Sequence, residues 1–115
     1  MISYIIDKCQ FGLMVINGEA YQADLIITPE RIISDWWRKE GHLLQLVDLE
    51  GLITEKIYSV FIGTGFQDKM KVDSQVIETL EGKNIPFVLK KTPVAVKEYN
   101  RHINKNKIGI FHLTC

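Results

Sequence analysis

Three short apolar segments, separated by two segments of helical periodicity, constrain the fold of this chain most. The apolar segments are 58–62, 86–90 and 107–112. Each has the length of a buried strand, and the two intervening segments place apolar residues at helical spacing. Strands that alternate with helices in this way form parallel sheets with right-handed crossovers. The second half of the chain therefore predicts a strand–helix–strand–helix–strand unit within an α/β fold.

The first predicted helix begins and ends at residues typical of helix boundaries. Asp73 or Ser74 can cap its N-terminus, and Gly82 can close it. Its expected buried stripe is Val76, Ile77 and Leu80.

The second predicted helix opens at Thr92-Pro93, because proline fits the first helical turn. The residues expected to point inward are Val96, Tyr99 and Ile103. The cations expected to face water are spaced at i, i+4 and are Lys97, Arg101 and Lys105.

The first third of the chain predicts β-structure. Residues 11–16 are largely apolar, Asn17-Gly18 is a strong signal for a type I′ hairpin turn, and residues 19–27 continue as the return strand. Residues 28–38 allow two interpretations. A helix can start at Thr28-Pro29, whereas β-branched and aromatic residues favour a strand that ends near Gly41-His42; we favour the strand.

Between these halves, Asp48 can cap a short helix, which Gly51 weakens. The resulting architecture is a single α/β domain over residues 1–115, with a mixed central sheet and an N-terminal β-hairpin.

Composition supports one folded domain. The chain has 115 residues, of which 46% are hydrophobic and 24% charged, as in ordinary globular proteins. No apolar run approaches the roughly 20 residues that cross a bilayer, and residues 1–4 lack the features of a signal peptide. Cys9 and Cys115 match no metal or redox spacing and are expected to be reduced thiols. We expect a cytoplasmic protein from a prokaryote, without membrane association.

The net charge is zero but unevenly distributed. Residues 1–82 hold 7 Lys/Arg and 13 Asp/Glu, a balance of −6, and residues 83–107 have a balance of +6. Such asymmetry can attract nucleic acid or an acidic partner. Among the cations only Tyr99 is available for base stacking, so nucleic-acid binding is not favoured over solvated surfaces. RNA contact through the helical cations is a third, weaker hypothesis.

If the three late strands are parallel, their carboxyl ends share one edge. That edge would hold Gly63-Thr64-Gly65, Lys91-Thr92 and His112. Open α/β sheets bind ligands there, and a helix N-terminus next to a lysine suits an anion. A third glycine and a Gly-Lys-Ser/Thr motif are both missing, so the glycines can equally serve a tight turn or close packing.

Carboxylates offer a second candidate site. Asp24 interrupts an apolar strand, and Asp35 precedes a tryptophan pair and Arg38. A carboxylate among apolar residues must pair, accept hydrogen bonds or shift its pKa. Asp24 or Asp35 could therefore form a charged cleft with Arg38, or only a structural ion pair. The sequence shows no metal-ligand spacing, no catalytic set and no cofactor motif, so we expect none of these.

Several stretches, read in order, resemble one family. They are Phe11-Gly12, Asp24-Leu25-Ile26-Ile27, Trp37-Arg38, Gly41-His42, Ile62-Gly63-Thr64-Gly65, Ala95-Val96-Lys97-Glu98-Tyr99-Asn100 and Phe111-His112-Leu113-Thr114-Cys115. Together they resemble the Mth-domain family, which includes the adipogenesis-associated Mth-domain protein and a mitochondrial complex I assembly factor. The resemblance implies a three-layer α/β domain with a mixed sheet, favours residues 31–38 as strand, and suggests binding to partner proteins.

Two functional hypotheses follow. The first is a non-enzymatic protein-binding or assembly-assisting module, monomeric or weakly dimeric. The second is an enzyme or small-molecule (anion) binder with its site near Gly63, Lys91 and His112. The absence of a complete catalytic motif favours the first. The sequence identifies neither a ligand nor a partner.

Overall fold

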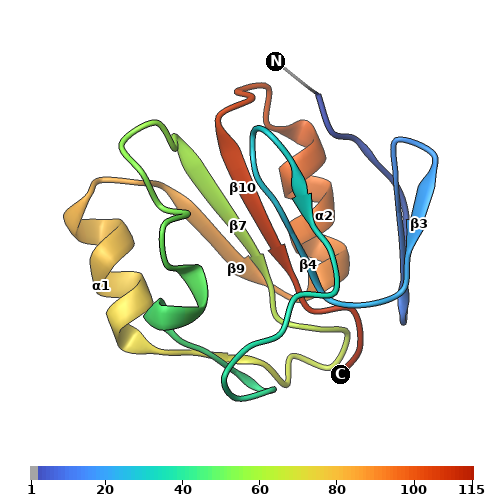
Figure 1. Ribbon diagram of the computed structural model, residues 1–115, viewed down its shortest axis with the longest axis horizontal. Helices are drawn as coiled ribbons and strands as arrows, with labels where there is room; N and C mark the ends of the chain where they lie inside the picture. Colours follow the sequence, from blue (N-terminus) through green and yellow to red (C-terminus); the bar gives the residue numbers. More distant parts are fainter. Residues whose placement is uncertain (1–2) are drawn as a thin grey trace.

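Five strands form a mixed sheet at the centre of the protein, which the computed structural model describes over residues 3–115. They are β4 (Leu25–Ile27), β5 (Ile32–Ile33), β7 (Ser59–Gly63), β9 (Phe87–Lys90) and β10 (Lys107–Phe111). Their order is β5-β4-β10-β7-β9 (Figure 1). Strand β7 pairs parallel with both β9 and β10, whereas β4 runs antiparallel to β10. The predicted parallel unit is confirmed. Met1 and Ile2 lie outside the described residues. They belong to the N-terminal segment 1–4, which is expected not to be a signal peptide.

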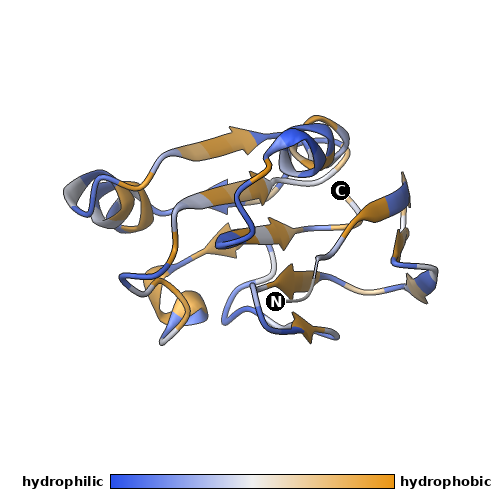
Figure 2. Ribbon diagram, turned by 90° about the horizontal axis from the view of Figure 1, so that it is seen from above, coloured by the Kyte–Doolittle hydropathy of each residue, from blue (hydrophilic) through white to orange (hydrophobic). Residues whose placement is uncertain are grey.

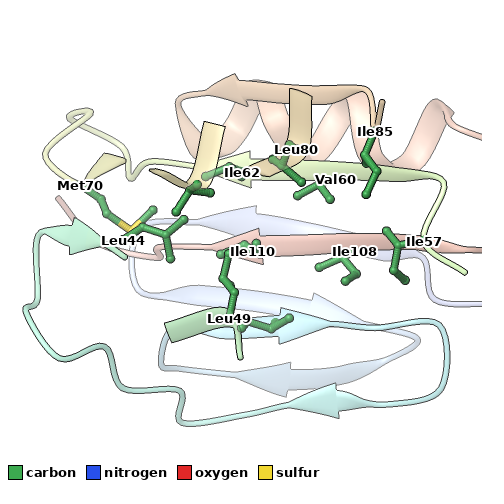
Figure 3. Close-up of a cluster of buried hydrophobic side chains, with 12 residues drawn as sticks. Leu44, Leu49, Ile57, Val60, Ile62, Met70, Leu80, Ile85, Ile108 and Ile110 are labelled. Atoms are coloured by element: carbon green, nitrogen blue, oxygen red, sulfur yellow. The ribbon is translucent and has the colours of Figure 1, made fainter. Parts of the chain in front are cut away.

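Side chains of the central strands alternate between two cores, one on each face of the sheet. Val60 and Ile62 of β7 point into the first core, and Phe61 points into the second. Figure 3 shows the first core, where isoleucines of β7 and β10 meet Leu49 and Leu80. This alternation follows from the two-residue period of a strand and accounts for the apolar runs in the sequence.

Helices and a second sheet cover these two faces. Helix α1 (Ser74–Gly82) and the 3-10 helix η1 (Leu46–Leu49) cover the first core. Helix α2 (Thr92–Arg101) and the N-terminal strands cover the second. Figure 2 shows the central sheet between these layers. The three-layer α/β prediction is therefore confirmed. Neither α1, of nine residues, nor α2, of ten, could span a bilayer, and the part of the chain seen in the structure holds no longer helix.

The helices begin close to their predicted positions. The Asp73 carboxylate caps α1 by accepting a hydrogen bond from the Gln75 amide, 2.9 Å away. Val76 and Leu80 are buried as expected, whereas Ile77 is only partly buried. Tyr99 of α2 is buried too, but Ile103 is 94% exposed, because α2 ends at Arg101. The prediction that Ile103 points inward was wrong.

The N-terminal strands form a separate three-stranded sheet of β1 (Ile6–Gln10), β2 (Leu13–Ile16) and β3 (Glu19–Tyr21). The β2–β3 turn has φ of +48° at Asn17 and +82° at Gly18, as a type I′ turn requires. The predicted return strand 19–27 is in fact divided. Its second part is β4, which leaves the hairpin and pairs with β10.

Two links fasten this N-terminal sheet to the rest of the protein. The Asn100 side chain of α2 accepts a hydrogen bond from the Ile6 amide at 3.0 Å and donates one to the Ile6 carbonyl at 2.9 Å. At the other end of β1, the Gly12 amide donates to the Leu113 carbonyl at 2.7 Å. The sheet is therefore held at both ends of its first strand.

Residues 28–38 are mostly loop. The Thr28 hydroxyl accepts a hydrogen bond from the Arg31 amide at 3.0 Å and closes a turn, after which only Ile32–Ile33 form a strand. The strand prediction holds only for those two residues. The strand does not continue, because Asp35 has a φ of +50°, which breaks extended structure. Two further short strands, β6 (Leu43–Leu44) and β8 (Lys71–Val72), pair in parallel and form a separate two-stranded sheet.

The short helix near Asp48 begins earlier than predicted. Gln45 is its N-cap, and Asp48 lies inside η1. The Asp48 carboxylate accepts hydrogen bonds from the Gln45 amide at 2.8 Å and the Lys39 amide at 2.9 Å. The carboxylate thus tightens the first turn from the inside.

Candidate functional site

The carboxyl ends of β7, β9 and β10 lie side by side at one edge of the sheet, here called the strand-end rim. Gly63 is paired with Phe111 on one side and with Lys90 on the other. The Thr64 amide donates to the Lys90 carbonyl at 2.9 Å. The predicted rim residues on β7, α2 and β10 are therefore neighbours.

Thr92 connects these strand ends. Its hydroxyl accepts a hydrogen bond from the Gly65 amide at 2.9 Å and donates one to the His112 carbonyl at 2.6 Å. Thr92 has no exposed surface. Its own amide donates to the Gly65 carbonyl at 3.1 Å, so this first amide of α2 is already bonded. Lys91, the N-cap of α2, is exposed at the edge of the rim.

Both rim glycines sit against neighbouring atoms. A Cβ added at Gly63 would lie 2.7 Å from Thr92 Oγ1, and one added at Gly65 would lie 2.4 Å from the Cys115 carbonyl carbon. Gly65 also has a φ of +104°. The segment that holds Cys115 is bound here, since its carbonyl accepts hydrogen bonds from the Gln67 amide at 2.8 Å and the Lys69 amide at 3.1 Å. Ligand binding at the rim stays a prediction, and these contacts show close packing around both glycines.

A buried charged cluster lies beside the rim and consists of Asp24, Arg38 and His112. Asp24 Oδ2 lies 2.8 Å from Arg38 Nη1 and 2.7 Å from His112 Nδ1. Asp24 Oδ1 accepts a hydrogen bond from the Leu113 amide at 2.8 Å. Side-chain exposure is 5% for Arg38, 5% for His112 and 15% for Asp24. The Asp24–Arg38 pair proposed from the sequence therefore forms, and His112 joins it.

Two opposing effects act on the pKa of Asp24. Burial raises it, but hydrogen bonds from His112, Leu113 and Arg38 lower it further than burial raises it. The net pKa is below that of an ordinary aspartate, so Asp24 is ionised at neutral pH. An ionised carboxylate only accepts hydrogen bonds, so His112 Nδ1 carries a proton toward Asp24.

The second ring nitrogen of His112 is the chemically notable atom of the cluster. Nε2 is buried and has no hydrogen-bond partner among the described residues. A histidine whose Nδ1 is held by a carboxylate can accept or donate a proton at Nε2. The ring of His42 stands edge-on to that of His112, with centroids 5.6 Å apart. Within residues 3–115, His, Cys, Asp and Glu side chains do not gather in threes that could share a metal ion.

Arg38 is held from several sides. Its Nε donates to the Gly41 carbonyl at 2.9 Å, Nη2 also donates to that carbonyl, and the guanidinium lies 4.9 Å from the ring centroid of Trp36. Trp37, in contrast, is 87% exposed. The loop thus uses one tryptophan to fix the arginine and presents the other at the surface.

Asp35 does not join the cluster. It is exposed and lines a separate surface hollow with Tyr21 and Ser34. Of the two carboxylates considered from the sequence, Asp24 is the one that pairs with Arg38.

Sequence reasoning singled out Asp24 and His112 separately and missed their contact. The contact depends on β4 lying next to β10 with Leu25 opposite Phe111, which places the preceding Asp24 beside the following His112. The sequence did contain a signal for this contact: Asp24 directly precedes one apolar strand, and His112 directly follows another. Choosing between possible neighbours of β10 needed the strand order.

Comparisons with known proteins agree with this fold. Residues 6–110 match the model of a family described as "Protein of unknown function (DUF498/DUF598)". The conserved hypothetical protein PH1505 from Pyrococcus horikoshii OT3 is similar in structure, with a TM-score of 0.79 and 24% identity over 96% of this chain and 98% of that one.

Two further solved structures are similar. MT938 has a TM-score of 0.77 and 26% identity over 98% of this chain and 100% of that one. A protein from Bordetella pertussis, described as a Mth938-like domain, has a TM-score of 0.61 and 11% identity over 96% of this chain and 85% of that one. Since the family model covers nearly the whole sequence, the chain belongs to the DUF498/DUF598 family of proteins of unknown function.

Proposed function

We propose that this chain is a non-enzymatic protein-binding or assembly-assisting domain. The observation that carries the proposal is the internal hydrogen bonding of Thr92, at the centre of the rim. The Thr92 hydroxyl is bonded to both Gly65 and His112, and a Cβ at Gly65 would meet the Cys115 backbone. The Thr92 hydroxyl and the Gly65 backbone thus serve the packing of the protein.

The exposed apolar side chains support the same proposal. Trp37 is 87% exposed and Ile103 is 94% exposed. Tryptophan is among the residues most enriched at the energetic centres of protein interfaces. The Mth-domain family, which the sequence resembles, includes a mitochondrial complex I assembly factor, and this resemblance also favours binding of other proteins. The same proposal includes a location in the prokaryotic cytoplasm and a monomeric or weakly dimeric state.

The test is capture of stable partners by the full chain. The tagged protein is used as bait in lysates of its native cells, and each recovered protein is tagged in turn. We expect at least one protein that recovers this chain reciprocally and co-elutes with it at a fixed ratio in size-exclusion chromatography. Failure of every candidate in the reciprocal capture would contradict the proposal.

A second candidate function is an anion-binding or catalytic site at the rim near Gly63, Lys91 and His112. The buried, unpartnered Nε2 of His112 favours it, because Asp24 holds the other ring nitrogen as in acid–base histidines. Thermal-shift screening against anions and nucleotides tests it. A ligand that stabilises the wild type and not His112→Gln supports this candidate, and stabilisation by none of them contradicts it.

A further inference from the structure

Strand β9 is an edge of the central sheet, and its outer side is open. The Val60 amide donates to the Pro86 carbonyl at 3.1 Å, and the Thr64 amide donates to the Lys90 carbonyl at 2.9 Å. Backbone groups of a strand alternate in direction, so even-numbered residues of β9 face β7. The amides and carbonyls of Phe87 and Leu89 therefore point outward, and within residues 3–115 no further strand pairs with β9. This edge can accept another strand.

A cavity of about 250 Å³ adjoins this edge, between β9, β7 and α2. Its lining is mainly apolar, with charged groups from α2, and consists of Ser59, Val60, Phe61, Pro86, Phe87, Val88, Glu98, Arg101 and His102. Leu89, 37% exposed, lies on the same strand, and Val94, 46% exposed, lies one turn before Glu98 on α2. An added strand would thus find a hollow for a side chain next to its backbone partner.

Two lining residues hold polar atoms that the described chain leaves unpaired. Ser59 Oγ and His102 Nδ1 are buried and have no hydrogen-bond partner there. Ser59 is 2% exposed. A buried polar atom without a partner is unfavourable, so an incoming side chain with a hydrogen-bonding tip would be favoured over a purely apolar one.

The charges around β9 are mostly positive. Lys83, Lys90 and Lys91 are exposed before, on and after the strand. Arg101 lines the cavity, and its partner Glu98, 3.3 Å away, is the cavity's acidic residue. Lysines on an edge strand disfavour pairing between two copies of the same strand, because like charges would face each other. They attract an acidic segment instead.

We propose that β9 binds an extended, acidic segment of a partner protein as an added strand. The segment's backbone pairs with Phe87 and Leu89, and one of its larger side chains, with a hydrogen-bonding tip, enters the cavity beside Ser59 and His102. This mode of recognition combines main-chain hydrogen bonds with a side-chain pocket. The inference rests on the proposed protein-binding function and assigns it a surface and a partner chemistry.

The test compares variants as baits in the same lysates. Leu89→Pro removes the outward-facing amide and leaves the hydrogen bonds to β7 in place. Leu89→Thr is its matched control, because it keeps that amide. Lys90→Glu with Lys91→Glu reverses the charge at the edge, and Lys8→Glu with Lys56→Glu makes the same change on exposed lysines outside β9, α2 and the cavity lining. Circular dichroism checks that each variant is folded.

We expect proteins captured by the wild type to fall at least fivefold with Leu89→Pro and with the edge charge reversal, and to be retained by both controls. A photo-cross-linking residue at position 89 should attach to an acidic segment of the captured partner. If Leu89→Pro does not fold, the charge-reversal variant and the cross-link at position 89 test the inference without it.

Three results would overturn the inference. Retention of the reciprocally verified partners by the edge variants means that protein binding stands but uses another surface. Capture of no partner removes the proposed function together with this inference. A cross-link from position 89 to a second copy of the chain, or to a basic segment, would show that β9 does not bind an acidic segment of a partner protein.

Discussion

Asp24 and His112 are 88 residues apart in the sequence, yet Asp24 Oδ2 lies 2.7 Å from His112 Nδ1. The same oxygen is paired with Arg38, whose side chain is 5% exposed. One carboxylate therefore neutralises a buried guanidinium and orients a buried imidazole. The cluster ties the loop that contains Arg38 to the end of β10.

Asp24→Asn is expected to lower the free energy of unfolding by about 3 kcal/mol, because it leaves the buried Arg38 without a counter-charge. Urea denaturation measures the change. The control is Asp35→Asn, where the carboxylate is exposed and a change within about 0.5 kcal/mol is expected. Equal effects of the two substitutions would show that the Asp24–Arg38 pair does not contribute to stability.

The contribution of Asp24 should depend on pH. Its folded pKa is lowered, so the stabilisation is present above the unfolded value of about 3.9 and is lost as the pH falls through the folded pKa. The difference in unfolding free energy between the wild type and Asp24→Asn should thus shrink below about pH 4. Urea titrations from neutral to acidic pH measure it. A difference that stays constant across this range would argue against a carboxylate with a lowered pKa.

Gly65→Ala should destabilise the protein by at least about 2 kcal/mol, because the new Cβ meets the Cys115 backbone and the φ of +104° disfavours any side chain. Gly41→Ala is the matched control, since no atom lies within 4 Å of its added Cβ. Thermal unfolding compares the two. Similar melting temperatures would mean that the backbone near Cys115 moves aside easily.

Cys9 should react slowly with alkylating reagents near neutral pH. Burial raises the pKa of its thiol to about 11, and the thiolate is the reactive form. We expect its alkylation rate, followed by mass spectrometry, to keep rising above pH 9, the ordinary value for the group. Cys9→Ser identifies the signal, because Cys9 and Cys115 are both free thiols. A rate that levels off by pH 9 would contradict the raised pKa.

Much of the fold was predictable because local signals and burial agreed. Asp73 and Pro93 mark helix starts, and apolar runs mark strands such as β7. Prediction failed where tertiary contacts override local patterns. Residues 22–24 read as a continuous strand, but the chain there leaves one sheet and enters another. Ile103 has helical spacing from Tyr99, yet α2 ends before it.

The candidate site was predictable only in its parts. Parallel strands brought Gly63, Thr92 and His112 to one rim, as the alternation of strands and helices implied. The local sequence pattern did not indicate how closely neighbouring atoms pack around the rim glycines and Thr92. The contact of Asp24 with His112 depends on the position of β4 next to β10, which is a choice among long-range pairings.

The side chain of Asn100 occupies both backbone groups of Ile6, so a helix residue takes the place that a neighbouring strand would have. Peeling the first strand away would break this amide pair and the Gly12–Leu113 bond at the opposite end. The amino-terminal sheet should therefore not open as an independent flap. Its amides and those of α2 should exchange with deuterium in one concerted event.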